Sequence, residues 1–159
     1  MTAVGDFLAR PEVCCETMNE VACPPHPPTP FDPMRRIYDH LDLRVPNLAE
    51  AAPFYETLLP ALGFVRRQTI EGWLQFEAAG HGVTEFFGVT ESGSHVANEN
   101  RVAFRAESVE AVDELAEVAV QAGARRVEGP LAYEPGYYAV FFEDLCGNRF
   151  EVCHRVPLT

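Results

Sequence analysis

Five cysteines carry the most direct nucleophilic and redox chemistry in this chain: Cys14, Cys15, Cys23, Cys146 and Cys153. An odd number of cysteines without a repeated spacing argues against a disulfide framework and favours free thiols. Cys153 follows Glu151 by two residues, so in a strand both side chains point to the same face. We expect the Cys153 thiol to be a small buried group and not a nucleophile, because nothing in the sequence indicates a lowered thiol pKa.

Four aromatic residues have the chemistry to bind a flat or apolar molecule: Trp73, Tyr133, Tyr137 and Tyr138. Aromatic rings bury large apolar areas, and the phenol and the indole each keep one polar group for hydrogen bonding. We expect these rings to form a wall of a small-molecule pocket. Packing in the core would explain one or two of them equally well.

The charge balance excludes some partners. Twelve basic and 24 acidic side chains give a formal net charge of -12, which would repel a phosphate backbone, so nucleic acid is excluded as a partner. The sequence has no apolar run near the roughly 18 residues that cross a membrane, and its first residues do not resemble a secretory signal. We therefore expect a soluble, cytoplasmic protein with a small-molecule ligand and no membrane partner.

Two segments with different patterns divide the chain. Prolines crowd residues 23–30, and proline lacks the amide donor that a helix or a central strand needs. We interpret residues 1–35 as a proline-rich N-terminal extension and residues 36–157 as one domain. Residues 1–30 should be removable with little loss of stability, because they contain few patterned apolar residues to bury.

The expected domain repeats one order of elements. A strand over 37–45, a helix between Asn47 and Gly63, and strands over 64–69, 73–78 and 83–90 are followed by a strand over 101–106, a helix between Ser108 and Gly123, and strands over 125–128, 137–143 and 149–154. The apolar spacing predicts the inward helix faces as Leu48, Ala52, Tyr55, Leu59 and Leu62, and as Val109, Val112, Leu115, Ala116 and Ala119.

This order predicts the fold class. Either half alone would expose the apolar face of its sheet, so we expect an α+β fold in which two βαβββ modules pair into an open, curved, mixed-sheet barrel with the helices outside. The concave inner face of that barrel is the candidate pocket.

Four segments of the sequence carry a family resemblance. The opening of vicinal-oxygen-chelate proteins resembles residues 38–45 and residues 52–56 with 62–64. The closing hairpin of these proteins resembles residues 136–142 and 144–152. These include glyoxalases, bleomycin-resistance proteins and extradiol dioxygenases. The resemblance covers residues 36–155 and implies the paired-module fold described above.

The resemblance also implies a site. Catalytic members of the family hold a divalent metal on histidine and glutamate side chains. By resemblance, His40 matches the first histidine ligand, and Glu151 matches the final glutamate ligand, which is also the expected catalytic residue. Glu85 is a candidate third ligand. The metal would be nickel, zinc, manganese or iron. Where members begin the fifth strand with histidine, this chain has Arg101, whose guanidinium stays protonated and cannot bind a metal. Alternatively, His40 is a hydrogen-bonded inner histidine, and Glu151 pairs with Arg101 to form a polar pocket floor.

Three functions follow from the resemblance. The first is a metal-assisted lyase, isomerase or ring-opening oxygenase, in which the metal stabilises an anionic intermediate. The second is a protein that binds a small molecule without metal or catalysis, and the third is a purely structural or interaction domain, since a fold does not dictate a function. In the first two, the residues expected to contact the ligand are Arg101, Trp73, Tyr133, Tyr137, Tyr138 and Cys153. Family members of this length often assemble in pairs, so we expect a homodimer.

Overall fold

Two halves of the chain repeat the same order of elements in a computed structural model, which describes residues 38–81 and 84–157. The first half contains β1 (His40–Val45), α1 (Leu48–Ala61), β2 (Arg66–Ile70), β3 (Trp73–Glu77) and β4 (Phe86–Glu91). The second contains β5 (Arg101–Arg105), α2 (Val109–Gln121), β6 (Arg125–Glu134), β7 (Tyr137–Glu143) and β8 (Arg149–Arg155). The predicted α+β fold with two βαβββ modules is confirmed.

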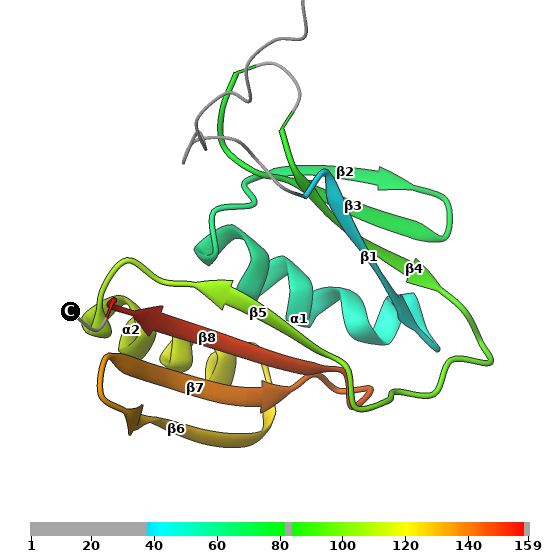
Figure 1. Cartoon of the computed structure of the whole chain (residues 1–159). Coiled ribbons are helices and arrows are strands. Elements are labelled where there is room, and N and C mark those ends of the chain that lie inside the picture. The colour runs from blue at the N-terminus through cyan, green and yellow to red at the C-terminus, as the bar shows by residue number, and fades with distance from the viewer. Residues whose placement is uncertain (1–37, 82–83, 158–159) are drawn as a thin grey trace, which may run out of the picture. The chain divides into compact units, whose positions relative to one another are not determined.

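Each half forms its own four-stranded mixed sheet (Figure 1). Sheet A has the order β1-β4-β3-β2, and sheet B has the order β5-β8-β7-β6. The pairs β1–β4 and β5–β8 are parallel, and the other neighbours are antiparallel. Among the described strands none pairs across the two sheets, so the sheets are not closed into a barrel and β1 and β5 are both edge strands.

Both helices begin at the predicted caps. The Asn47 side chain accepts a hydrogen bond from the Glu50 amide at 3.2 Å, and the Ser108 hydroxyl accepts one from the Ala111 amide at 3.2 Å. Each cap pairs with one of the amides that the first helical turn leaves without a backbone acceptor. Gly63 follows the first helix with a φ of 97°, a backbone conformation that glycine adopts without strain.

The helix faces differ in part from the prediction. The buried residues of α1 are Ala51, Phe54, Tyr55, Leu58 and Leu59, and those of α2 are Val112, Ala116 and Ala119. Tyr55 and Leu59 are confirmed, whereas Leu48 and Leu62 lie at the margin and are only partly buried. Val109 is 37% exposed, so its predicted inward position is wrong. It is the first residue of its helix, where few neighbours can cover it.

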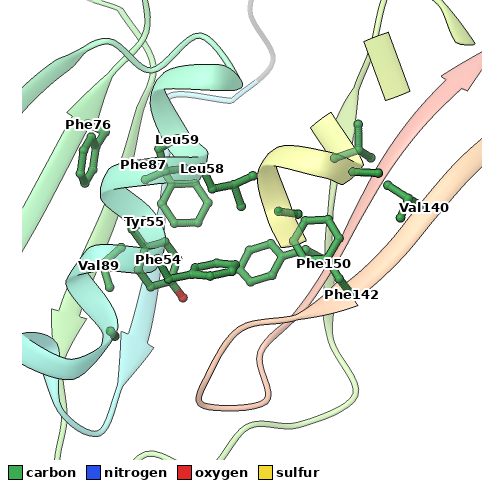
Figure 2. Close-up of a cluster of buried hydrophobic side chains, with 14 of the residues drawn as sticks. Phe54, Tyr55, Leu58, Leu59, Phe76, Phe87, Val89, Val140, Phe142 and Phe150 are labelled. Atoms are coloured by element: carbon green, nitrogen blue, oxygen red, sulfur yellow. The ribbon is translucent and has the colours of Figure 1, made fainter. Parts of the chain in front are cut away.

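One aromatic core spans both halves (Figure 2). Phe54 of α1 lies 6.2 Å from Phe150 of β8 between ring centroids, and Phe150 stacks on Phe142 of β7 at 5.7 Å. Phe104 of β5 continues the cluster toward sheet A, 6.0 Å from Phe87 of β4. Each fully buried phenylalanine contributes roughly 1.5–3 kcal/mol by removal of apolar surface from water.

A buried polar link joins the halves beside this core. The Tyr55 hydroxyl of α1 donates to the Asp144 carboxylate at 2.5 Å, and Asp144 is 1% exposed. Asp144 also accepts from the amides of Cys146 and Asn148 and from the Asn148 side chain, at 2.8 to 2.9 Å. Burial, together with the Asp144 carboxylate, raises the pKa of Tyr55 far above its ordinary value. The phenol therefore stays protonated and keeps donating.

Several strand boundaries differ from the prediction. The strand expected over 83–90 begins only at Phe86, and the strand expected over 125–128 continues to Glu134, past Pro130. The longer strand, β6, is an edge strand with several register shifts. Proline has no amide hydrogen to donate, and an edge strand tolerates the absence of that donor. In the described part of the chain no helix is both long enough and apolar enough to span a membrane.

Candidate small-molecule pocket

A cavity of about 570 Å³ lies between the edge strands β1 and β5, and we call it the β1–β5 pocket. Its apolar lining comes from both halves: Leu41, Phe64, Phe87, Val102 and Phe104. His40 of β1, Glu85 and Phe86 from the start of β4, and Arg101 of β5 line it as well. Three of the residues singled out in the sequence therefore line one cavity, whose volume suits a small organic molecule.

His40 stacks on Phe86. Their ring centroids are 4.5 Å apart with planes 2° from parallel, and the two residues are Cα partners on the parallel strands β1 and β4. The Nδ1 atom of His40 lies 2.8 Å from Asp39. The partner of His40 on β4 is thus an aromatic ring and not the carboxylate of Glu85.

Glu85 occupies the position before Phe86. Because successive side chains of an extended chain point to opposite sides, Glu85 does not share the side on which Phe86 stacks on His40. It still lines the β1–β5 pocket, directly before the start of β4. The register that pairs His40 with Phe86 decides this orientation.

Arg101 is held by a carboxylate and a ring. Its Nη1 lies 3.6 Å from Glu151, and its guanidinium carbon lies 4.4 Å from the ring centroid of Phe141. Glu151 is only 5% exposed, and it accepts a 2.6 Å hydrogen bond from the Tyr137 hydroxyl. Arg155 approaches the same carboxylate at 3.8 Å. This arrangement matches the alternative in which Glu151 pairs with Arg101.

The protonation of Tyr137 follows from its surroundings. Burial first, and then the hydrogen bond to Glu151, raise the pKa of Tyr137 to about 12. The phenol therefore remains a donor to the Glu151 carboxylate at neutral pH.

The residues present do not fit a divalent metal. In residues 38–81 and 84–157 no group of three or more histidine, cysteine, aspartate or glutamate side chains could hold one. Phe86 stands beside His40, and the permanent cation of Arg101 stands beside Glu151. Metal sites need several donors converging on one point, and an adjacent guanidinium opposes a second cation electrostatically. The structure does not bring His40, Glu85 and Glu151 together as a ligand set.

The predicted aromatic wall is divided between two sheets. Tyr133 and Tyr137 lie together on sheet B, 6.0 Å apart between ring centroids, whereas Trp73 lies on sheet A, 6.0 Å from Phe86. Tyr138 does not join them, because its hydroxyl donates to Asp113 of α2 on the opposite face of sheet B. Adjacent strand residues cannot share a face, so alternation excludes one of Tyr137 and Tyr138.

Cys153 lies on the same face of sheet B as Glu151. It is a free thiol, 8% exposed, and burial and then Glu151 raise its pKa above the ordinary value. A raised pKa leaves little reactive thiolate at neutral pH. Cys146 is also free, and Cys14, Cys15 and Cys23 lie outside the described residues.

Sequence reasoning missed three residues around the site. Phe86 covers His40, Phe141 lies under the Arg101 guanidinium, and Arg155 approaches Glu151. The period of two along 149–155 already places Arg155 on the face of Glu151, so that signal was present in the sequence. Phe86 gave no such signal, because its position beside His40 depends on the register of two strands far apart in the chain.

Comparisons with known proteins agree with this fold. The family model described as glyoxalase/bleomycin resistance protein/dioxygenase superfamily matches residues 37–152. A glyoxalase/bleomycin resistance protein from Albidiferax ferrireducens is 22% identical with a TM-score of 0.64, and the match covers 76% of this chain and 100% of that one. No curated protein matches the sequence.

Two further solved structures are similar. A glyoxalase/bleomycin resistance protein/dioxygenase family enzyme from Burkholderia phytofirmans is 17% identical, covers 74% of this chain and 98% of its own, and has a TM-score of 0.56. The fosfomycin resistance protein FosX from Mesorhizobium loti is also 17% identical with a TM-score of 0.56, over 77% of this chain and 95% of its own. At such identities the likeness shows the fold, whereas the family model spans most of the chain. The chain therefore belongs to the glyoxalase/bleomycin resistance protein/dioxygenase superfamily.

Proposed function

We propose that this protein binds a small organic molecule in the β1–β5 pocket without the help of a metal ion. The observation that carries the proposal is the pairing of Arg101 with Glu151 at 3.6 Å beside the pocket. This pairing places a fixed cation where a metal-dependent member would need a neutral donor. Of the functions that the resemblance implies, metal-independent binding fits these residues better than metal-assisted catalysis.

The lining of the pocket supports binding of an apolar body. Leu41, Phe64, Val102 and Phe104 supply apolar surface, and the charged groups of Glu85 and Arg101 provide polar contacts. A mostly apolar cavity with a few converging polar groups is the usual composition of small-molecule sites.

The test combines metal analysis with the binding of a neutral probe. We expect the full-length protein, purified without added metal, to contain far less than one metal ion per chain. We also expect it to bind Nile red with an affinity that a chelator leaves unchanged. Ala103→Trp should reduce binding of the dye at least about tenfold, because Ala103 lines the pocket and a large side chain would fill it.

The matched control is Val96→Trp, since Val96 is 82% exposed and does not line the pocket. It should bind the dye like the parent. Loss of binding after chelation, or equal binding by Ala103→Trp and the parent, would contradict the proposal.

A further inference from the structure

Arginines are concentrated on one face of sheet B. All twelve lysine and arginine positions of this acidic chain are arginines. Four of them lie on the same face of two adjacent strands: Arg101 and Arg105 on β5, and Arg149 and Arg155 on β8. The register pairs Arg101 with Arg149 as Cα partners, so two like charges stand side by side. Adjacent like charges destabilise a sheet, so this placement is unexpected in a chain with twice as many acids as bases.

Four carboxylates share this face with the arginines. Along β5, β7 and β8 the residues of this face include two acids, Glu143 and Glu151, and the edge strand β6 adds Glu128 and Glu134, the Cα partners of Phe141 and Tyr137. Glu151 lies 3.6 Å from Arg101 and 3.8 Å from Arg155, and Glu143 lies 3.6 Å from Arg149. These separations are longer than charge-assisted hydrogen bonds of about 2.7–2.9 Å. The guanidinium N–H groups therefore keep donor capacity for a further anion.

Arg101 connects this face with the β1–β5 pocket. Its side chain is 45% exposed and lines the pocket, yet the Phe141 ring at 4.4 Å and Glu151 hold the guanidinium in place. A planar guanidinium fixed in this way presents paired donors that match the two oxygens of a carboxylate. Its apolar neighbours in the lining, Val102 and Phe104, lie on the same strand.

Arg101 gives the pocket a direction. It lines the cavity from β5, whereas Leu41 and Phe64 line it from the first half of the chain. An acidic group on a ligand is attracted by the Arg101 guanidinium. A ligand with one acidic end would therefore place that end at β5 and its apolar body against Leu41 and Phe64.

We propose that the β1–β5 pocket takes an organic anion, in which an apolar or aromatic body fills the cavity and a carboxylate-like oxyanion pairs with Arg101. This inference rests on the proposed metal-independent binding and names the class of its ligand. Arg101 is the residue that selects the anion, and Glu151 is a positioning residue that holds the guanidinium through its own bond to Tyr137.

The experiment compares two probes that share the same naphthalene ring system and differ in charge. Calorimetric titration of the full-length protein with 2-naphthoate and with 2-naphthamide isolates the charge of the ligand. We expect the acid to bind at least about tenfold more tightly than the amide, which is the range for hydrogen bonds to charged groups. The preference should shrink at high salt, because exposed charges are screened.

Variants identify the residue responsible. Arg101→Gln should bring the two affinities within about twofold, because it weakens binding of the acid and leaves binding of the amide unchanged. Arg101→Lys should keep part of the preference for the acid, since lysine retains the positive charge but lacks the planar, two-pronged guanidinium. Arg105→Gln is the matched control, because Arg105 lies on the same strand and face but does not line the pocket. It should keep the preference, and thermal unfolding should show that each variant is folded.

The outcomes separate this inference from the proposed function. If the parent binds Nile red but shows no preference for the acid, or binds neither naphthalene, the ligand class is wrong while the binding function holds. A preference that survives in Arg101→Gln also overturns the inference. If no probe binds, both proposals fail.

Discussion

Arg101 places a fixed positive charge 3.6 Å from Glu151, at a position where the family resemblance implies a histidine. Under the proposals above, this single side chain selects an anion over a metal ion. Because Arg101 lies 3.6 Å from Glu151, a neutral nitrogen donor at position 101 would stand near that carboxylate.

Arg101→His should bind Ni²⁺ at least about tenfold more tightly than the parent does. The substitution removes the competing cation and adds an imidazole donor. Calorimetric titration measures the difference, and the gain should disappear when Glu151→Ala is added. Equal nickel affinity in Arg101→His and the parent would show that residue 101 does not occupy a ligand position.

Tyr137 predicts how stability depends on pH in the alkaline range. Its pKa rises from 10.0 to about 12 in the folded protein, so the folded state binds this proton more tightly than the unfolded state does. The stabilisation is therefore complete below pH 10 and is lost as the pH rises through about 12. Urea unfolding between pH 9 and 12 should show a steeper loss of stability in the parent than in Tyr137→Phe. Parallel losses would contradict this, because the shifted phenol of Tyr55 is present in both proteins.

The turn between β7 and β8 connects two elements that are distant in sequence. Asp144 in this turn accepts from Tyr55 of α1 and from two amides of its own turn. Asp144→Ala would leave several buried donors without an acceptor. We expect it to lower the free energy of unfolding by about 3 kcal/mol or more, and Tyr55→Phe by about 1–3 kcal/mol.

Denaturant unfolding of both variants and of the double variant measures the coupling. The double variant should lose less than the sum of the two single losses, because the variants remove the same bond. Strict additivity would show that the link between the halves contributes nothing of its own.

Gly88 of β4 leaves room for the single tryptophan of the chain. A Cβ atom at this position would lie 2.7 Å from Nε1 of Trp73, which is closer than such atoms approach. Gly88→Ala should displace the indole, change its fluorescence emission and cost about 1–3 kcal/mol of stability. Gly93→Ala is the control, since no neighbouring atom lies within 4 Å of that Cβ. Unchanged emission in Gly88→Ala would mean that the indole does not lie over β4.

The order of the elements was readable from the sequence because local signals specify it. Asn47 and Ser108 are helix caps by residue type, and apolar spacing marks the helices between them and the glycines that follow. The start of β4 was not readable in this way. Residues 83–85 resemble a strand by composition, but the pairing of His40 with Phe86 sets the register, and that pairing is a tertiary contact. The same contact determines the side to which Glu85 points.

The sequence predicted which residue types belong to the candidate site better than it predicted how they are arranged. Of the residues singled out in the sequence, His40 and Arg101 line one pocket, and Glu151 pairs with Arg101. That Phe86 covers His40 follows from strand register, which residue types alone do not fix.

The whole molecule exposes apolar groups along its sheet edges. Ile70 of β2 is 47% exposed and Leu131 of β6 is 43% exposed, and both strands are edges. Edge strands with apolar side chains tend to pair with another chain. We predict a homodimer, so light scattering at micromolar concentration should give twice the chain mass of 17.7 kDa.

Leu131→Lys should shift that dimer toward monomer, because a buried lysine at a symmetric contact is unfavourable. Val96→Lys is the control, since Val96 is exposed in the segment between the halves. A parent mass of 17.7 kDa would exclude the dimer at that concentration.

Each sheet takes all its strands from one half, and residues 92–100 are the covalent connection between the halves. The first half of this segment is held in place: the Ser92 amide donates to the Val45 carbonyl at 2.8 Å, and the His95 ring lies 3.0 Å from the Asn148 side chain. The shared core needs one N-terminal half and one C-terminal half. The strand pairing, however, does not require both halves to belong to the same polypeptide. Shortening residues 92–100 would consequently favour reciprocal exchange of halves between two polypeptides, with the same aromatic core rebuilt in an intertwined pair.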